Sequence, residues 1–215
     1  MIAPLRAMAP GRIKLIGFDL DGVLLDFHPD RRLHYLAQLT GKEPDAIHEA
    51  IWGSEFERKA EAGAYRTGAE YLKAFNQRLG HELTREQWIA GRRAAMRVRP
   101  DMLELARRLR GRISLAILTN NGALLGEALP ELAPEVCEVF GEACHTSSSF
   151  EARKPDLLVY RRLVQHHGIE PGSALFIDDD IRNVAGAISA GLQGIHFQGL
   201  DALQRSLAEF IPGLH

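Results

Sequence analysis

The stretch Ile16-Gly17-Phe18-Asp19-Leu20-Asp21-Gly22-Val23 decides how this chain is expected to fold. An apolar run leads into it, and two carboxylates two residues apart follow directly before a glycine. Because a buried carboxylate is costly without a partner, acids at the end of an apolar strand are expected to have a use. The stretch therefore predicts a buried strand that ends at a functional site.

Further apolar runs predict more strands of this kind, and near-continuous apolar runs are typical of a parallel sheet covered on both faces. Strands are expected over 13–18, 113–118, 174–177 and 194–197, with a shorter one over 143–146. Helical patterns lie between them, over 100–110, 122–129, 155–167 and 181–190. This alternation predicts an α/β fold with a doubly wound, Rossmann-like parallel sheet.

Residues 29–98 break the alternation, because they show helical patterns and no convincing strand. Helices are expected over 31–40, 45–60, 67–79 and 84–96, the last with a capping box at Thr84-x-x-Gln87. The pattern predicts a helical cap domain of residues 29–98, inserted into an α/β core of residues 11–28 and 99–215. The insertion follows directly on the paired carboxylates, so its helices are expected to lie over them, exclude water and select the substrate.

Composition narrows the range of partners. The 26 Lys and Arg residues nearly balance the 28 Asp and Glu residues, giving a formal net charge of −2, which favours neither nucleic acid nor a membrane. Cys137 and Cys144 are too few for a disulfide framework or a thiolate zinc site and predict reduced thiols. Met1–Pro10 lacks the apolar core of a signal peptide, so a cytoplasmic protein with a short lead-in is expected. The sequence leaves the oligomeric state open.

Polar residues follow three of the predicted strands. They are Asp19 and Asp21, Thr119 and Asn120, and Asp178 and Asp179. In an open α/β sheet the ligand site forms at the carboxyl ends of the strands, so these side chains are expected to converge. Clustered carboxylates raise one another's pKa, and a hard divalent cation removes that cost. Oxygen ligands favour magnesium over zinc.

The same residue types fit phosphoryl transfer. One carboxylate attacks phosphorus and forms an acyl phosphate, and a carboxyl two residues on protonates the leaving oxygen and then activates water. A hydroxyl from Thr119 and the ammonium of Lys154, expected at a helix start before Pro155, hold the other phosphoryl oxygens.

Four motifs occur in order between Phe18 and Gly191: Asp-x-Asp-Gly-Val, Leu-Thr-Asn, Arg-Lys-Pro-Asp and Phe-Ile-Asp-Asp-x-x-x-Asn-Val. Together they make the chain resemble the haloacid dehalogenase superfamily, whose cap follows the first motif. It is most similar to the branch with sugar-phosphate phosphatases, haloacid dehalogenases and the phosphatase domain of soluble epoxide hydrolase. The resemblance implies a magnesium-dependent phosphatase of a small metabolite that works through an aspartyl-phosphate.

The resemblance also implies roles for single residues. Asp19 is the expected nucleophile and a metal ligand, and Asp21 is the expected general acid and base, with its backbone carbonyl on magnesium. Thr119 and the backbone amide of Asn120 are expected to bind the phosphoryl group. Lys154 is expected to neutralise the nucleophile and the phosphate.

The last motif implies a further ligand. Counting back from Asn183-Val184 places Asp179 at the family's magnesium position, and Asn183 is expected to orient that loop. Asp178 is either a second ligand or an acceptor beside the metal. Glu151 departs from the branch, which often has Gly there, and this leaves the conformation of 147–153 open.

Several alternatives remain open from the sequence. A phosphomutase uses the same four motifs, whereas a 2-haloacid dehalogenase typically lacks an acid at the position of Asp21; a non-enzymatic binding module is disfavoured because the reactive residues are all present. A sugar phosphate, phosphoglycolate or a nucleotide such as flavin mononucleotide fits as substrate. Residues considered as substrate contacts in the inserted helices are Trp52, Phe56, Arg58, Tyr65 and Arg66.

Overall fold

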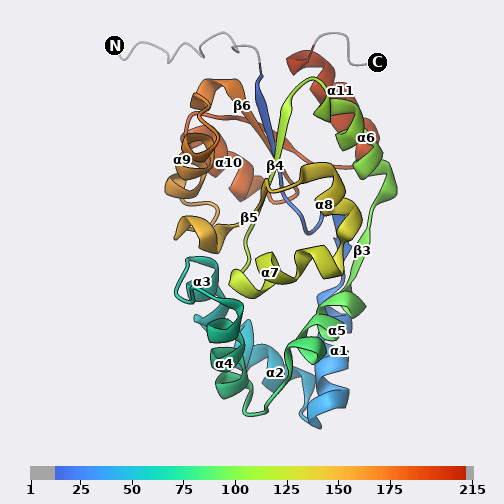
Figure 1. The fold of residues 1–215 in the computed structure, drawn as a ribbon, viewed down its shortest axis with the longest axis vertical. Coiled ribbons are helices and arrows are strands. Elements are labelled where there is room, and N and C mark those ends of the chain that lie inside the picture. Colours follow the sequence, from blue (N-terminus) through green and yellow to red (C-terminus); the bar gives the residue numbers. More distant parts are fainter. Residues whose placement is uncertain (1–12, 212–215) are drawn as a thin grey trace.

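The centre of the molecule is a parallel sheet of five strands in the order β5-β4-β1-β6-β7, seen in a computed structural model that describes residues 13–211 (Figure 1). Its strands are β1 (Leu15–Phe18), β4 (Ser114–Thr119), β5 (Cys144–Thr146), β6 (Ala174–Asp178) and β7 (Gln193–His196). The predicted α/β fold with a parallel sheet is confirmed, and each predicted strand is present with its ends shifted by one or two residues.

Helices cover both faces of the sheet because successive strand side chains point in opposite directions. Ile16 and Phe18 belong to one apolar cluster with α6 (Pro100–Arg110), α7 (Ala123–Leu132), α8 (Pro134–Phe140) and α11 (Leu200–Phe210). Leu15 and Phe176 belong to a second cluster with α9 (Leu157–His166) and α10 (Ile181–Ser189). The two clusters therefore cover the sheet on both faces.

Five helices gather at one end of the molecule, beyond α7 (Figure 1). They are α1 (Pro29–Thr40), α2 (Pro44–Ile51), α3 (Phe56–Glu61), α4 (Gly68–Leu79) and α5 (Arg85–Ala95). The antiparallel strands β2 (Leu25–Phe27) and β3 (Met96–Val98) join this group to the sheet. Below, α1–α5 are called the inserted helices.

Several details differ from the sequence predictions. The single helix expected over 45–60 is wrong, because the Ser54 hydroxyl donates to Ala50 and Ile51 and caps α2 at its end. The prediction that residues 29–98 contain no strand is also wrong, because β3 lies at their end. Helices α8 and α11 and the 3-10 helices η1 (Ser147–Phe150) and η2 (Pro171–Ser173) were not predicted.

Of two predicted helix starts, one is confirmed and one is wrong. The capping box of Thr84 and Gln87 is confirmed, but Pro155 does not begin a helix, since Asp156 is the N-cap of α9. The predicted lead-in over Met1–Pro10 lies outside the described residues. Between residues 13 and 211, no helix is both long and apolar enough to cross a membrane.

Candidate active site

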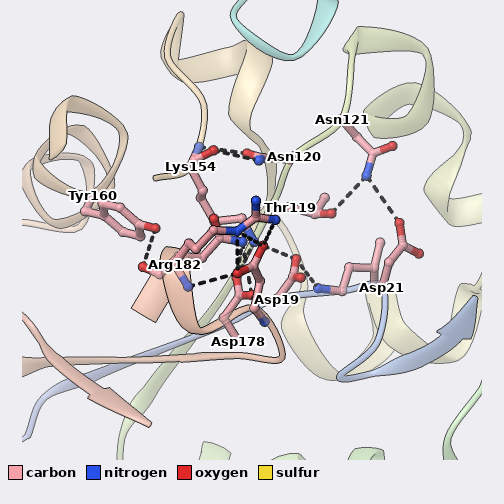
Figure 2. Close-up of polar contacts among 12 residues, drawn as sticks. Asp19, Asp21, Thr119, Asn120, Asn121, Lys154, Tyr160, Asp178 and Arg182 are labelled. Atoms are coloured by element: carbon pink, nitrogen blue, oxygen red, sulfur yellow. Dashed lines mark hydrogen bonds and ion pairs between the residues drawn. The ribbon is translucent and has the colours of Figure 1, made fainter. Parts of the chain in front are cut away.

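The strand register brings the predicted site residues to one edge of the sheet. Phe18 in β1 pairs with Ile117 in β4 and with Ile177 in β6, so the next residues, Asp19 and Asp178, lie side by side. Thr119 ends β4 at the same edge. Figure 2 shows these side chains pointing toward a common centre, which is the convergence that the sequence predicted.

A buried lysine joins two of the carboxylates. The Lys154 ammonium lies 2.8 Å from Oδ1 of Asp19 and 2.6 Å from Oδ2 of Asp178, and 1% of the Lys154 side chain is exposed. The backbone amide of Leu20 also donates to Oδ1 of Asp19. Both contacts fall on one oxygen of Asp19, which leaves Oδ2 as the oxygen available for chemistry.

Burial and charge act in opposite directions on this pair. Burial, together with the charges of Asp178 and Asp21, raises the pKa of Asp19 to about 7, although Lys154 works against the rise. For Lys154, burial lowers the pKa, but the attraction of Asp19 and Asp178 outweighs it and leaves that pKa raised. The site therefore holds a charged ammonium next to carboxylates that burial destabilises.

Both carboxylate oxygens of Asp178 accept hydrogen bonds. Besides Lys154, its oxygens accept from the Asn183 side chain at 3.1 Å and from the backbone amide of Asp180 at 2.8 Å. Asn183 thus orients this loop, as expected, and Asp180 caps α10. Because its lone pairs are occupied, Asp178 suits the position beside a metal better than the position of a direct ligand.

The carboxylates of Asp19, Asp178 and Asp179 each offer an oxygen within 4.8 Å of the others. Gly22 has φ +89°, and a Cβ there would lie 2.3 Å from Oδ2 of Asp179. The glycine therefore lets the backbone approach this acid closely. Burial and the charge of Asp178 raise the pKa of Asp179. An all-oxygen cluster of this kind fits a hard divalent cation such as magnesium.

Thr119 and Asn120 lie where the sequence placed them, and Asn121 adds a contact that it did not predict. The side chain of Asn120 donates to the Lys154 carbonyl and accepts from the Lys154 amide, so it fixes the backbone that carries the lysine. Asn121 donates to Oγ1 of Thr119 at 2.9 Å. This bond orients the threonine hydroxyl at the end of β4 (Figure 2).

The family model for haloacid dehalogenase-like hydrolases matches residues 13–191, a range that contains all of these side chains. The chain belongs to this family. A protein named phosphatase MT3486 from Mycobacterium tuberculosis is 30% identical over 190 residues, which cover 84% of this chain and 85% of that protein.

Two other relatives of this hydrolase are informative. Flavin mononucleotide hydrolase 1 of Arabidopsis thaliana is 42% identical over 57 residues, which are 26% of this chain and 23% of that protein. A HAD family enzyme of Bacteroides thetaiotaomicron, crystallised with magnesium and inorganic phosphate, superposes with a TM-score of 0.72 at 22% identity, covering 85% of this chain and 93% of that one. This likeness supports the fold.

In this hydrolase an inserted helix contacts the second aspartate. Nη2 of Arg92, in α5, lies 2.7 Å from Oδ1 and 2.5 Å from Oδ2 of Asp21. Arg92 is 2% exposed and Asp21 is 22% exposed. Arg92 was not predicted, although the sequence holds a signal for it: it lies four residues after Trp88 and three after Ile89, on the apolar face of its helix.

A cavity of about 190 Å³ lies between the inserted helices and the sheet edge. It is lined by Asp21, Arg32, Arg92, Trp52, Trp88, Glu57, Tyr71 and neighbouring residues. Of the contacts considered from the sequence, Trp52 lines this cavity, whereas Phe56 is packed among aromatic rings. Arg58 is exposed and paired with Glu55, and Tyr65 and Arg66 line a separate open groove. Arg32 was also missed.

Proposed function

We propose that this hydrolase is a magnesium-dependent phosphatase that cleaves a small phosphorylated metabolite through an aspartyl-phosphate on Asp19. One observation supports this most strongly. A buried lysine is held against Asp19, and a second acid, Asp21, lies two residues on and borders the cavity. A relative that aligns along most of the chain is named a phosphatase.

In the first step, Oδ2 of Asp19 attacks phosphorus and the ester bond breaks. The departing oxygen takes a proton from the Asp21 carboxyl group. Lys154 and the Thr119 hydroxyl hold the equatorial oxygens of the phosphoryl group, where negative charge is concentrated. In the second step, Asp21 takes a proton from water, which attacks phosphorus and releases inorganic phosphate and free Asp19.

Arg92 and Asn121 position these groups. The Arg92 guanidinium holds the carboxylate of Asp21 at the border between sheet edge and cavity, and Asn121 holds the Thr119 hydroxyl. Because Arg92 belongs to an inserted helix, Asp21 gains this partner only when α5 lies against the sheet edge. We propose that the inserted helices, residues 29–98, act as a cap over a core of residues 11–28 and 99–215.

The acids at the strand ends would hold the metal. Asp19, Asp179 and the backbone carbonyl of Asp21 are the proposed ligands, with Asp178 beside them because its oxygens already accept other bonds. When bound, Mg²⁺ would neutralise charge on the phosphoryl oxygens.

The direct test is hydrolysis of p-nitrophenyl phosphate by the purified protein, with magnesium and with EDTA. We expect release of p-nitrophenol that depends on magnesium. No release, together with halide release from chloroacetate, would show a dehalogenase instead. Product analysis on a hexose 1-phosphate distinguishes a phosphomutase, which would form the 6-phosphate rather than inorganic phosphate.

A further inference from the structure

Three buried hydrogen-bond donors lack a partner within residues 13–211, and the residues that carry them line one cavity. They are Nη2 of Arg32, Nε of Arg92 and Nε1 of Trp88. Each residue lines the cavity of about 190 Å³ that also contains Asp21. A buried donor without an acceptor costs about 1–3 kcal/mol, so three in one place indicate a missing acceptor. The acceptor is expected to be part of the ligand.

Arg32 lines this cavity without a direct ion pair among residues 13–211, although the charges of Glu57 and Asp21 oppose the lowering of its pKa by burial. Arg32 is 5% exposed. Its guanidinium carbon lies 5.1 Å from the ring centre of Trp52 and 4.8 Å from that of Trp88. No carboxylate of the described chain lies in ion-pair contact with it. Two indole rings hold the charge in place, but they do not replace the hydrogen bonds that a buried guanidinium needs.

Two acids of the inserted helices line this cavity, and both have other partners. Glu61 pairs with Arg153. The charge of Glu57 opposes the lowering of the Arg32 pKa by burial, and the Glu57 carboxylate accepts a hydrogen bond of 2.5 Å from the Tyr71 hydroxyl. Arg92 is already paired with Asp21, so its contribution to a ligand is limited to Nε. The cavity therefore presents donors from Arg32 and Trp88 at a short distance from the acid that serves the leaving oxygen.

We infer that Arg32 and Trp88 bind a carboxylate on the leaving group, so that the substrate is a small phosphomonoester of a hydroxy acid. This inference rests on the proposed function and extends it to substrate class. A carboxylate has two acceptor oxygens and matches the planar donors of a guanidinium. The cavity is smaller than the roughly 300–1,000 Å³ typical of drug-sized ligands, so a flavin-sized leaving group is disfavoured.

The test compares 2-phosphoglycolate with 2-hydroxyethyl phosphate. The first ester carries a carboxylate where the second carries a neutral hydroxymethyl group. The wild-type protein should show a kcat/KM about 10–100 times higher for phosphoglycolate, the range expected when a ligand charge gains a charged hydrogen-bond partner. Arg32→Gln should remove this preference and leave kcat/KM for 2-hydroxyethyl phosphate within about threefold. Arg31→Gln, at the exposed neighbouring arginine, is the matched control and should keep the preference.

Equal kcat/KM values for the two esters in the wild-type protein would overturn the inference. An Arg32→Gln variant whose kcat/KM falls by the same factor for both esters would also overturn it. The wild-type comparison stands even if Arg32→Gln fails to fold. In that case Arg32→Lys, which keeps the charge, should retain part of the preference.

A binding measurement separates this inference from the proposed function. Trp52 and Trp88 are the two tryptophans of the chain, and both flank Arg32, so their fluorescence reports on the cavity. In Asp19→Asn with magnesium, phosphoglycolate should change the emission at a Kd about tenfold lower than 2-hydroxyethyl phosphate. If neither ester is hydrolysed by the wild type but this difference holds, the subsite stands and the proposed function fails. Equal Kd values overturn the subsite.

Discussion

Lys154 lies within 2.8 Å of Asp19 and 2.6 Å of Asp178, with 1% of its side chain exposed. A lone ammonium at this depth would lose its charge, but two carboxylates keep it charged. Asp178 in turn is oriented by Asn183 and by the amide of Asp180. Asp19, the proposed nucleophile, therefore stands at the end of a chain of buried contacts that orient it.

Gly22 provides a test of how close the backbone must come to Asp179. Gly22→Ala should lower phosphatase activity at least about tenfold, because the new Cβ would lie 2.3 Å from Oδ2 of Asp179 at φ +89°. Steady-state kinetics over a magnesium titration measure the loss. Gly168→Ala is the control for backbone strain alone, since φ is +64° there and a Cβ would meet nothing within 4 Å. Equal activity loss in both variants would contradict this role of Gly22.

Arg92 provides a test of the contact with Asp21. Arg92→Gln should lower kcat for p-nitrophenyl phosphate about 10–100-fold, because a charge-assisted pair worth about 1.5–3 kcal/mol is lost. The control is Arg93→Gln at the exposed adjacent arginine. An unchanged kcat in Arg92→Gln, with the fold intact by circular dichroism, would show that Asp21 needs no such partner.

The sequence predicted the site residues that lie in the four motifs and missed the arginines that the inserted helices contribute. Asp19 directly follows β1, and Thr119 and Asp178 end β4 and β6, so strand register brings them together. Lys154 reaches them from the loop between η1 and α9. Arg32 and Arg92 belong to the inserted helices α1 and α5, outside the motifs, and only their places on apolar helix faces could have revealed them.

The strands that carry these residues were predictable where the apolar run in the sequence was long. Strand β1 is flanked by β4 and β6, both continuous apolar runs. Strand β3 was missed because it has three residues, one of them the exposed Arg97, and forms only by pairing with β2. Tertiary pairing, rather than local propensity, makes this strand.

Contacts between elements hold the inserted helices against the sheet domain. The Gly68 amide, at the start of α4, donates to Glu127 in α7, and Arg153 pairs with Glu61 at 2.5 Å. The Ser147 hydroxyl in η1 donates to the carbonyl of Glu61. These contacts fix α3 and α4 near the sheet edge, and they involve residues that no local pattern singles out.

A group of histidines between β5 and the end of α9 should make the stability of the fold depend on pH. His145 packs against His166 and His167, and burial, followed by the charges of those two residues, lowers its pKa from 6.5 to about 4. Between these pH values the unfolded chain binds a proton that the folded chain does not, so stability should fall as pH drops from 6.5 to 4. Urea unfolding across this range should show a shallower fall for His145→Gln than for the wild type. His34→Gln, at an exposed histidine, is the control. Parallel curves for wild type and His145→Gln would contradict the effect.

At the scale of the whole molecule, the site joins segments from most of the chain. Asp19, Lys154 and Asp178 come from the sheet domain, and Arg32 and Arg92 from the inserted helices. The sequence predicted a core and a cap of residues 29–98, because these residues interrupt the strand and helix alternation, and this division stays a prediction. It could not predict the shape of the cavity between the parts, since that depends on how helix faces pack.

Magnesium should stabilise the folded protein as a whole. Binding to the native carboxylate cluster, and not to the unfolded chain, should raise Tm by about 2–5 °C at saturating magnesium. Differential scanning fluorimetry measures the shift. Asp179→Asn should reduce it, whereas Asp201→Asn, at an exposed acid on α11, should not. A shift that is the same in all three proteins would contradict the proposed metal site.

The proposed function depends most on the claim that Asp19 is the nucleophile of a phosphatase. The most direct measurement is kcat for p-nitrophenyl phosphate in Asp19→Asn, with Asp180→Asn as the matched acid-to-amide control at a helix N-cap that Asn can also serve. With native circular dichroism in both, Asp19→Asn should lose at least about 1,000-fold in kcat and Asp180→Asn less than about threefold. Activity in Asp19→Asn within about tenfold of the wild type would contradict the claim.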